Sequence, residues 1–423
     1  MKTLDILVPT LAGPLRGKRI AYDYRNSFVK KRLCLPISTL FLDITGMNCE
    51  SLPYGADGDP DCAITPIGEE FAGFAQDRMQ QFGQMLDAKG EEHPSNPRVI
   101  LQNIADRLQA RGWQITVACE LEFYMLRSAD PLQAYGDSGD CANVNCYALD
   151  DLEAVEKILR MIELIAAAQS LPIPAITSEY SSGQFEINLH YQTDAVRACD
   201  HAVLLKRLIK HCASHYGMEA CFLPKPFQNR SGSGLHYHVG LRDNAGANIM
   251  AGDISDPVTG LSVSEVFLHA LAGMQTLAKE SMLLFAPFAN SYRRLGGVYT
   301  PIRVDYGYDD RRVTLRVPKI HDPQDLRMEH RITGADANPY LGLAAILAAM
   351  DYGIEKRLSP KRRAPVLTKR WADALGDFAS AKILPSYFDA QTYHDITQMG
   401  HHHFDSYHRL IPDLDIRLYN RHV

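Results

Sequence analysis

Residues 119–123 have the sequence Cys119-Glu120-Leu121-Glu122-Phe123, in which acidic and apolar side chains alternate. Successive side chains of a β-strand point to opposite faces, so the pattern predicts a strand that carries both glutamates on one face. Residues 183–189, 235–239, 313–317 and 328–332 show the same alternation. Together the five stretches predict an antiparallel sheet with one polar and one apolar face.

The polar face of this predicted sheet is built from a narrow set of residue types. Besides the two glutamates of the first strand it carries Gln184, Glu186, Asn188, His236, His238, Arg316, Glu329 and Arg331. For any single strand a solvated face explains the alternation equally well, because such faces are routine in antiparallel sheets. Five strands that favour Glu, His and Arg over Lys and Ser instead indicate a functional site.

Carboxylates that crowd on one face repel each other and are pushed towards protonation unless a cation lies between them. Several glutamates with a histidine form an oxygen-rich ligand set that suits Mg²⁺ or Mn²⁺ better than structural zinc. Nearby arginines bind phosphate or carboxylate groups through paired hydrogen bonds. Because no GxxxxGK motif occurs, these features predict phosphoryl transfer outside the P-loop class.

The composition excludes several other classes of protein. Of 423 residues 46% are hydrophobic and 22% charged, as in ordinary globular chains. The net charge of -6 lacks the basic surplus of a general nucleic-acid binder. The longest apolar run, residues 340–350, is shorter than the ~20 residues of a membrane span. We therefore expect a cytoplasmic protein with neither nucleic acid nor membrane as its partner.

The polar stretch at residues 91–97 contains two prolines and predicts a linker between two domains. The sequence therefore predicts an α+β chain with a small N-terminal domain at residues 1–95 and a larger domain at residues 96–423. Residues 39–44 predict a strand in the first domain. In the second, apolar residues recur at helical spacing within residues 152–165, 263–279 and 340–355.

A series of motifs between residues 115 and 345 resembles the glutamine synthetase family. The motifs are Glu120-x-Glu122, Glu179, Gly183-Gln184-x-Glu186, Ser231-Gly232-Ser233-Gly234-Leu235-His236-x-His238, residues 290–295, residues 311–316, Arg327-x-Glu329-x-Arg331 and residues 337–340. The resemblance implies an N-terminal β-grasp domain, followed by a catalytic domain whose antiparallel sheet forms a partial barrel backed by helices. It also implies a homo-oligomer, a dodecamer of two hexameric rings, with each active site between neighbouring subunits.

The resemblance further implies two or more Mg²⁺ or Mn²⁺ ions per active site. Ligands of one ion would be Glu122, Glu179 and Glu186, and those of a second ion, which also holds the phosphates of ATP, would be Glu120, His236 and Glu329. The nucleotide would contact Tyr191, through its adenine ring, together with His238, Arg316 and Arg327.

The other substrates have implied partners as well. Glutamate would bind Arg294 and Arg331 through its carboxylates and lie against Gly232, while Arg311, Arg316 and Arg327 neutralise the transferring phosphoryl group. The amine would bind near Tyr147, Glu179 and an Asp43 contributed by a neighbouring subunit. As a single aspartate after a predicted strand, Asp43 is equally well explained as a turn residue.

Two departures from the family pattern concern the substrates. Ser231 stands where the family has asparagine, and Thr300 stands where glutamine synthetases carry a flap glutamate that binds ammonium. These differences resemble the γ-glutamyl-amine and γ-glutamylpolyamine synthetase branch, so we expect ATP-dependent ligation of L-glutamate to a primary amine or polyamine through γ-glutamyl phosphate. Two alternatives stay open, an ordinary glutamine synthetase that uses ammonia and a non-catalytic ring protein. A shifted flap, in which Asp309 or Asp310 supplies the carboxylate, would favour the first of them.

Overall fold

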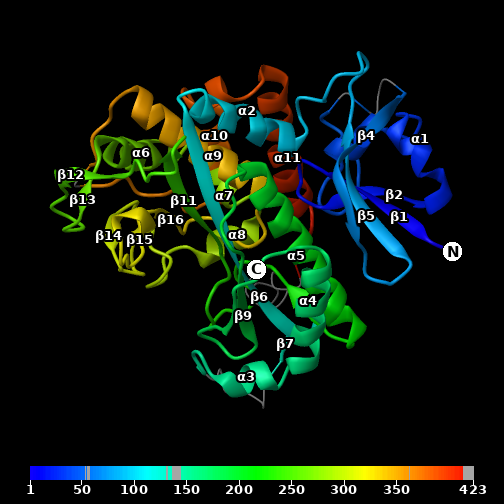
Figure 1. Cartoon of the computed structure of the whole chain (residues 1–423), viewed down its shortest axis with the longest axis horizontal. Helices are drawn as coiled ribbons and strands as arrows, with labels where there is room; N and C mark the ends of the chain where they lie inside the picture. Colours follow the sequence, from blue (N-terminus) through cyan, green and yellow to red (C-terminus); the bar gives the residue numbers. More distant parts are fainter. Residues whose placement is uncertain (53, 55–57, 130–131, 136–143, 362, 413–423) are drawn as a thin grey trace, which may run out of the picture.

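The computed structural model describes residues 1–423 apart from residues 53, 55–57, 130–131, 136–143, 362 and 413–423. The described residues form a five-stranded sheet near the N-terminus, a nine-stranded sheet and a two-stranded ribbon. The two larger sheets lie apart in Figure 1, with the smaller one at the right and the long strand β6 (Trp113–Ala129) running through the middle.

The small sheet has the strand order β2-β1-β5-β4-β3. Its strands are β1 (Thr3–Pro9), β2 (Leu15–Ala21), β3 (Cys34–Pro36), β4 (Asp61–Ala72) and β5 (Arg78–Met85). The central pair β1–β5 is parallel and the outer pairs are antiparallel. This is the β-grasp arrangement that the family resemblance implies.

The strand predicted at residues 39–44 is wrong. The chain instead forms a short 3₁₀ helix, η2 (Ile37–Phe41), directly after Pro36. The consecutive residues Thr39, Leu40 and Phe41 are all buried, which a helical turn allows and an edge strand with one apolar face does not. The Phe41 ring stacks on Tyr54 with ring centroids 3.9 Å apart.

The large sheet has the strand order β14-β15-β16-β11-β6-β9-β8, and β7 and β10 also pair with β6. Its remaining strands are β7 (Leu132–Ala134), β8 (Ala175–Ser178), β9 (Gln184–Asn188), β10 (Glu219–Cys221), β11 (Leu235–Asp243), β14 (Tyr306–Tyr308), β15 (Leu315–Val317) and β16 (Met328–His330). All five predicted strands are present. The sheet is mixed rather than purely antiparallel, because β14 and β15 pair in parallel.

The register of these strands aligns the polar residues. His236 lies opposite Glu120, and Glu186 lies opposite Glu122. On the other side of β11, Glu329 is paired with both His238 and Arg316. Residues 235–241 are buried on both faces of β11, so the polar face is not an ordinary solvated surface.

Helices cover the apolar face of the sheet and the rest of the core. They are α2 (Pro97–Gln109), α3 (Leu149–Glu153), α4 (Glu156–Ala168), α5 (Ala195–His215), α6 (Glu265–Leu277), α7 (Met282–Phe285), α8 (Ala289–Arg294), α9 (Pro339–Glu355), α10 (Trp371–Ala379) and α11 (Ala390–His408). Both α2 and α5 pack on β6, and α9 packs on α2, α5 and α6. No helix among the described residues has the length and apolar character needed to cross a membrane.

The predicted linker at residues 91–97 is a packed segment. Ser95 and Asn96 are fully buried. The Asn96 side chain accepts a hydrogen bond from the backbone of Arg98 and so caps α2, which begins with Pro97. Ser95 contacts Asp395 of α11 through a hydrogen bond of 3.1 Å. The division into domains at residue 95 stays a prediction.

Candidate active site

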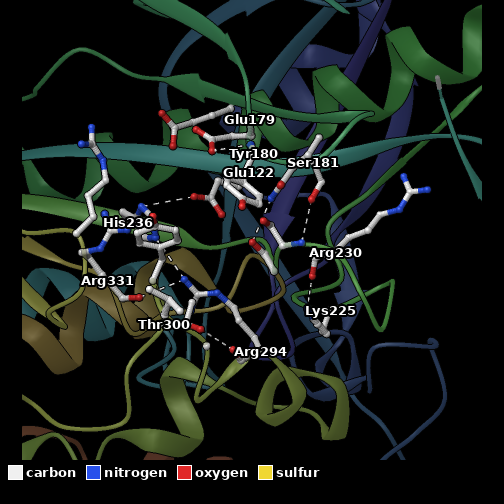
Figure 2. Close-up of a pocket in the computed structure, with 18 of the residues that line it drawn as sticks. Glu122, Glu179, Tyr180, Ser181, Lys225, Arg230, His236, Arg294, Thr300 and Arg331 are labelled. Atoms are coloured by element: carbon white, nitrogen blue, oxygen red, sulfur yellow. Dashed lines mark hydrogen bonds and ion pairs between the residues drawn. The ribbon is translucent and has the colours of Figure 1, made fainter. Parts of the chain in front are cut away.

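A cavity of about 900 Å³ opens on the polar face of the large sheet (Figure 2). It brings together residues that lie far apart in the sequence. Of the predicted site residues, those that line it are Glu120, Glu122, Tyr147, Glu179, Glu186, Gly232, His236, Arg294, Thr300, Arg311, Arg316, Glu329 and Arg331.

A second cavity of about 310 Å³ lies beside the first. It is lined by Tyr191, His238 and Arg327, the other three residues predicted to contact the nucleotide. Glu120 lines both cavities, and its carboxylate is 2.8 Å from Nε2 of His238. The predicted nucleotide residues are therefore divided between the two cavities, because Arg316 lies in the first.

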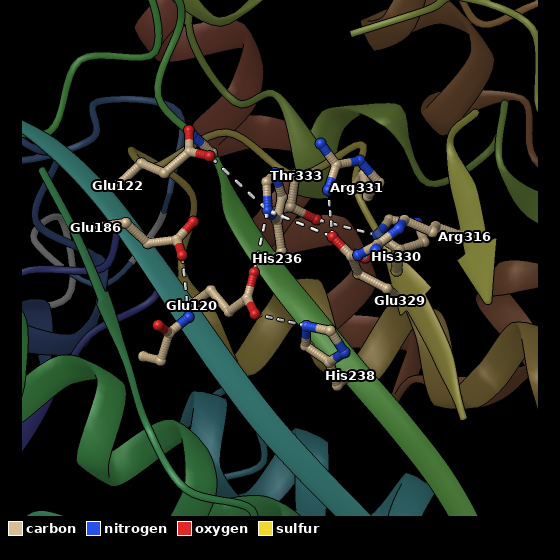
Figure 3. Close-up of polar contacts among 12 residues, drawn as sticks. Glu120, Glu122, Glu186, His236, His238, Arg316, Glu329, His330, Arg331 and Thr333 are labelled. Atoms are coloured by element: carbon tan, nitrogen blue, oxygen red, sulfur yellow. Dashed lines mark hydrogen bonds and ion pairs between the residues drawn. The ribbon is translucent and has the colours of Figure 1, made fainter. Parts of the chain in front are cut away.

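His236 lies at the centre of the acidic cluster (Figure 3). Its Nδ1 atom is buried and has no hydrogen-bond partner in the described part of the chain. Carboxylate oxygens of Glu120, Glu122 and Glu329 lie 3.6, 3.9 and 3.7 Å from that nitrogen. These distances are too long for hydrogen bonds, but they leave a space between one nitrogen and several oxygens that fits a divalent cation.

Among the described residues, two sets of three are close enough to share an ion. One is Glu120, His236 and Glu329, as the resemblance implies, and the other is Glu122, Glu186 and His236. Glu179 is not in the second set, although it lines the same cavity. Its carboxylate accepts a hydrogen bond of 3.2 Å from the backbone N–H of Tyr180.

The crowding divides the glutamates into two electrostatic groups. Burial and the neighbouring carboxylates raise the pKa of Glu179 to about 7 and that of Glu186 to about 9. Burial also pushes the pKa of Glu329 upwards, but His238, Arg331 and His236 outweigh it and hold the pKa at about 2. For Glu120, His238 and His236 likewise outweigh burial and hold the pKa well below its usual range. Without a cation, the cluster therefore retains protons at neutral pH.

Two arginines hold the carboxylate of Glu329 from both sides. Arg316 donates to one oxygen at 2.8 Å, and Arg331 donates to the other. Arg316 also pairs with Asp309 at 2.6 Å. The Nε atoms of both arginines are buried, and no described residue forms a hydrogen bond with them. Both side chains thus retain donors at the cavity that could contact phosphoryl or carboxylate oxygens.

Arg294 forms part of the opposite wall, at the end of α8. Its guanidinium donates to the backbone carbonyls of Ile332 and Arg331 at 2.9 and 3.2 Å, while its Nε has no partner among the residues that the structure describes. Burial lowers its pKa to about 10, which leaves it charged at neutral pH. A Cβ atom at Gly232 would lie 2.7 Å from both Cγ of Arg294 and the Pro224 carbonyl, so only glycine fits beside this side chain.

Thr300 lies in the flap, the segment at residues 296–301 that follows Arg294. Its hydroxyl donates to the Arg294 carbonyl at 2.7 Å, and its own carbonyl accepts from the Gly296 N–H at 2.8 Å. Asp309 and Asp310, the alternative sources of a flap carboxylate, do not line the cavity. Their carboxylates pair with Arg316 and Arg312. The flap accordingly places no described carboxylate at the cavity.

Aromatic residues form the mouth of the cavity, and most of them were not predicted. Tyr180 and Tyr299 approach each other across it with ring centroids 6.3 Å apart. Tyr147, a predicted residue, also lines the mouth and has an unusual positive φ of 60°. Tyr180 directly follows Glu179 and Tyr299 directly precedes Thr300. This adjacency to predicted site residues is the sequence signal that could have indicated that the two tyrosines line the site.

Asp43 lies outside both cavities of its own chain. One carboxylate oxygen accepts hydrogen bonds of 2.8–2.9 Å from the backbone N–H groups of Thr45, Gly46 and Met47. The other lies 3.3 Å from Nε2 of His402 on α11. Within the chain Asp43 is thus a turn residue, and its contribution to a neighbouring site stays a prediction.

Comparison with known proteins gives matches over the whole chain. A family model described as glutamine synthetase, catalytic domain, matches residues 94–419. The gamma-glutamylputrescine synthetase PuuA of Escherichia coli (strain K12) is 33% identical over 438 residues, 98% of this chain and 90% of that protein. The glutamate–isopropylamine ligase of a Pseudomonas species is 34% identical over 380 residues, 85% of this chain and 79% of that protein.

Solved structures share the fold. A complex of GmaS with ADP has a TM-score of 0.86 at 23% sequence identity, and the match covers 100% of this chain and 97% of that one. GmaS without ligand has a TM-score of 0.85 at 24% identity, covering 99% of this chain and 96% of that one.

Proposed function

The chain belongs to the glutamine synthetase family, and from this we propose that it ligates L-glutamate to a primary amine or polyamine, with ATP as the phosphoryl donor. The observation that carries the proposal is the convergence of the acidic cluster and three buried or half-buried arginines, Arg294, Arg316 and Arg331, on one cavity. A degenerate, non-catalytic relative would be expected to lose members of this set.

The acidic cluster would hold the metal ions. Glu120, His236 and Glu329 form one ligand set, and Glu122 and Glu186, with Glu179 in reach of the same cavity, form the other. Bound Mg²⁺ or Mn²⁺ supplies positive charge that neutralises phosphoryl oxygens during transfer. The unpartnered Nδ1 of His236 and the retained protons of the glutamates support this assignment.

The chain's own cations would carry the phosphoryl step. An oxygen of the glutamate γ-carboxylate attacks the γ-phosphorus of ATP, and the bond from phosphorus to the ADP oxygen breaks. Arg294 and Arg331 would hold the glutamate, while Arg311, Arg316 and Arg327 neutralise charge on the transferring group. The products of this step are ADP and γ-glutamyl phosphate.

Amide formation then needs a neutral amine. Alkylamines have pKa values near 10 and are mostly protonated at neutral pH. Glu179 lines the cavity beside Tyr147 and Tyr180 and is the carboxylate that we assign to receive that proton. The amine nitrogen attacks the acyl phosphate carbonyl, and the carbon–oxygen bond to phosphate breaks, so the amide and phosphate form.

The cavity mouth favours a substituted amine over ammonia. The flap places Thr300 rather than a carboxylate beside Arg294, and its hydroxyl is already bonded. Tyr147, Tyr180 and Tyr299 instead offer aromatic surface to an alkyl chain. Burying methylene groups there contributes about 0.8 kcal/mol each, which offsets the lost contact between ammonium and a flap glutamate.

The smaller cavity would hold the adenine end of the nucleotide. Tyr191 is exposed at its edge and able to stack on a base. His238 lies 2.8 Å from the Glu120 carboxylate, and Arg327 contacts the other ring nitrogen of His238 at 3.3 Å. We also propose the dodecamer of two hexameric rings, in which Asp43 completes a neighbouring site.

The deciding experiment measures ADP release at fixed glutamate and ATP with ammonia, ethylamine, isopropylamine, putrescine and spermidine. We expect kcat/KM to be higher for at least one substituted amine than for ammonia. A clear preference for ammonia would make the chain a glutamine synthetase. No glutamate-dependent ADP release with any acceptor would favour the non-catalytic alternative.

A further inference from the structure

Lys206 is a lysine in a mostly apolar part of α5. Its Nζ donates a hydrogen bond of 2.7 Å to the backbone carbonyl of Ala335 and lies 5.0 Å from the ring centroid of Phe222. Lysines are rarely withdrawn from water without a specific partner. The role of the Lys206 charge is therefore expected to involve the loop that contains Ala335.

The same loop holds the short helix α8 at both ends. At the start, Asp336 accepts a hydrogen bond of 2.7 Å from the Ser291 hydroxyl, whose oxygen in turn accepts from the Phe288 N–H at 3.1 Å. At the end, the Arg294 guanidinium donates to the backbone carbonyls of residues 331 and 332. The loop at residues 331–336 thus connects Lys206 to the arginine at the cavity.

A helix as short as α8, with six residues, has little stability of its own. Its orientation depends on its attachments, and the Nε of Arg294 has no hydrogen-bond partner among the described residues. A small tilt of α8 would therefore misdirect that donor. Asp336 retains a second oxygen, Oδ1, that is buried and accepts no hydrogen bond from the described residues. Lys206 is one of the positive charges that act on this carboxylate.

We propose that Lys206, Asp336 and Ser291 are positioning residues that aim Arg294 at the carboxylate of the bound glutamate. This inference rests on the proposed function, because it assumes that Arg294 binds glutamate. None of the three residues lines the cavity. They act on glutamate binding only through the loop and α8, so ATP and the amine should be affected little.

The variants are Lys206→Met, which keeps the aliphatic length and removes the charge, and Ser291→Ala, which removes the hydroxyl at α8. The matched control is Lys210→Met. Lys210 lies one turn further along α5 and 5.7 Å from the same Phe222 ring, but it is exposed. Both lysines contact this ring, whereas Lys206 also donates the hydrogen bond to the Ala335 carbonyl.

We expect both variants to raise KM for glutamate about tenfold, the effect of one hydrogen bond to a charged group. KM for ATP, KM for the amine and kcat should stay within about twofold, and Lys210→Met should match the wild type. Calorimetric titration of glutamate should show the same loss of affinity. The double variant should lose less than the product of the two single effects, because both act through one element.

An unchanged KM for glutamate in Ser291→Ala, or equal rises of KM for glutamate and ATP, would overturn the inference. Ser291→Ala also covers the case in which Lys206→Met does not fold. Glutamate binding by the wild type distinguishes failure of the proposed function from failure of the positioning role. If the wild type binds no glutamate, the proposed function itself is wrong. If it binds glutamate and the variants match it, only the positioning role fails.

Discussion

Glu186 offers a sharp test of the electrostatics of the acidic cluster. Burial and the carboxylates of Glu120, Glu122 and Glu179 raise its pKa to about 9, so the folded, metal-free protein keeps it protonated at neutral pH. In the unfolded chain a glutamate has a pKa near 4.3. Because the folded pKa is raised, the contribution to stability is complete below the unfolded pKa and is lost as the pH rises through about 9.

The size of the effect follows from linkage. Each retained proton changes the free energy of unfolding by about 1.4 kcal/mol per pH unit. Between pH 7 and pH 9, Glu186 alone should lower the stability of the metal-free protein by about 2 kcal/mol. Glu179, with a pKa of about 7, contributes mainly below this window. The raised pKa of His238 acts in the same direction.

Glu186→Gln should remove this dependence, because an amide does not titrate yet still accepts the hydrogen bond of 3.0 Å from Asn188. The assay is urea unfolding at pH 7, 8 and 9 in a chelator, at one protein concentration because subunit assembly shifts apparent stability. We expect the variant to lose about 2 kcal/mol less than the wild type over this range. It should also gain less from added Mg²⁺ at pH 9, where the cation replaces the proton.

Glu163→Gln is the matched control, because Glu163 is an exposed carboxylate on α4 that only pairs with Arg160 at the surface. It should follow the wild type at every pH. If Glu186→Gln instead loses as much stability as the wild type between pH 7 and pH 9 without metal, Glu186 does not hold the proton. The account of the crowded carboxylates would then be wrong.

Three further predictions concern other parts of the site. Glu329→Ala and His236→Ala should each remove most activity, because each loses a ligand of one predicted ion. The assay is turnover at saturating Mg²⁺ and ATP, and near wild-type turnover in either variant would contradict the assigned ligands. Thr300→Glu should lower KM for ammonia relative to that for ethylamine, because it restores a carboxylate to the flap. If the ratio of kcat/KM for ammonia to kcat/KM for ethylamine is unchanged, the flap does not have this role. Mixed oligomers of Asp43→Ala and Arg331→Ala chains should recover some activity over either inactive parent, because hybrid interfaces can pair two intact halves; no recovery in verified hybrids would contradict the shared site.

The sheet and its ligands could be predicted because the relevant pattern is local. Alternation within 119–123 already places Glu120 and Glu122 on one face, and the same rule applies to the partner strands. The family motifs then identified these strands as parts of one site. The register His236–Glu120 and Glu186–Glu122 is what brings the ligands together in space.

Predictions failed or stayed open where the outcome depends on contacts between distant segments. Residues 39–44 have the composition of a strand, but burial against Leu11 and Tyr54 favours the helical turn of η2. Loops and short turns of this kind take their conformation from the scaffold around them.

The direction of a charged side chain is harder to predict than its identity. Arg294 was expected at the site from its motif, yet its guanidinium is fixed by carbonyl groups about forty residues further along the chain. The sequence does not indicate a role for Lys206, because one lysine in a helix is usually a solvated residue. Only the fold shows that its ammonium ends on the loop that carries those carbonyls and Asp336. A motif therefore locates the group that binds, whereas the groups that aim it are found only when the chain is seen folded.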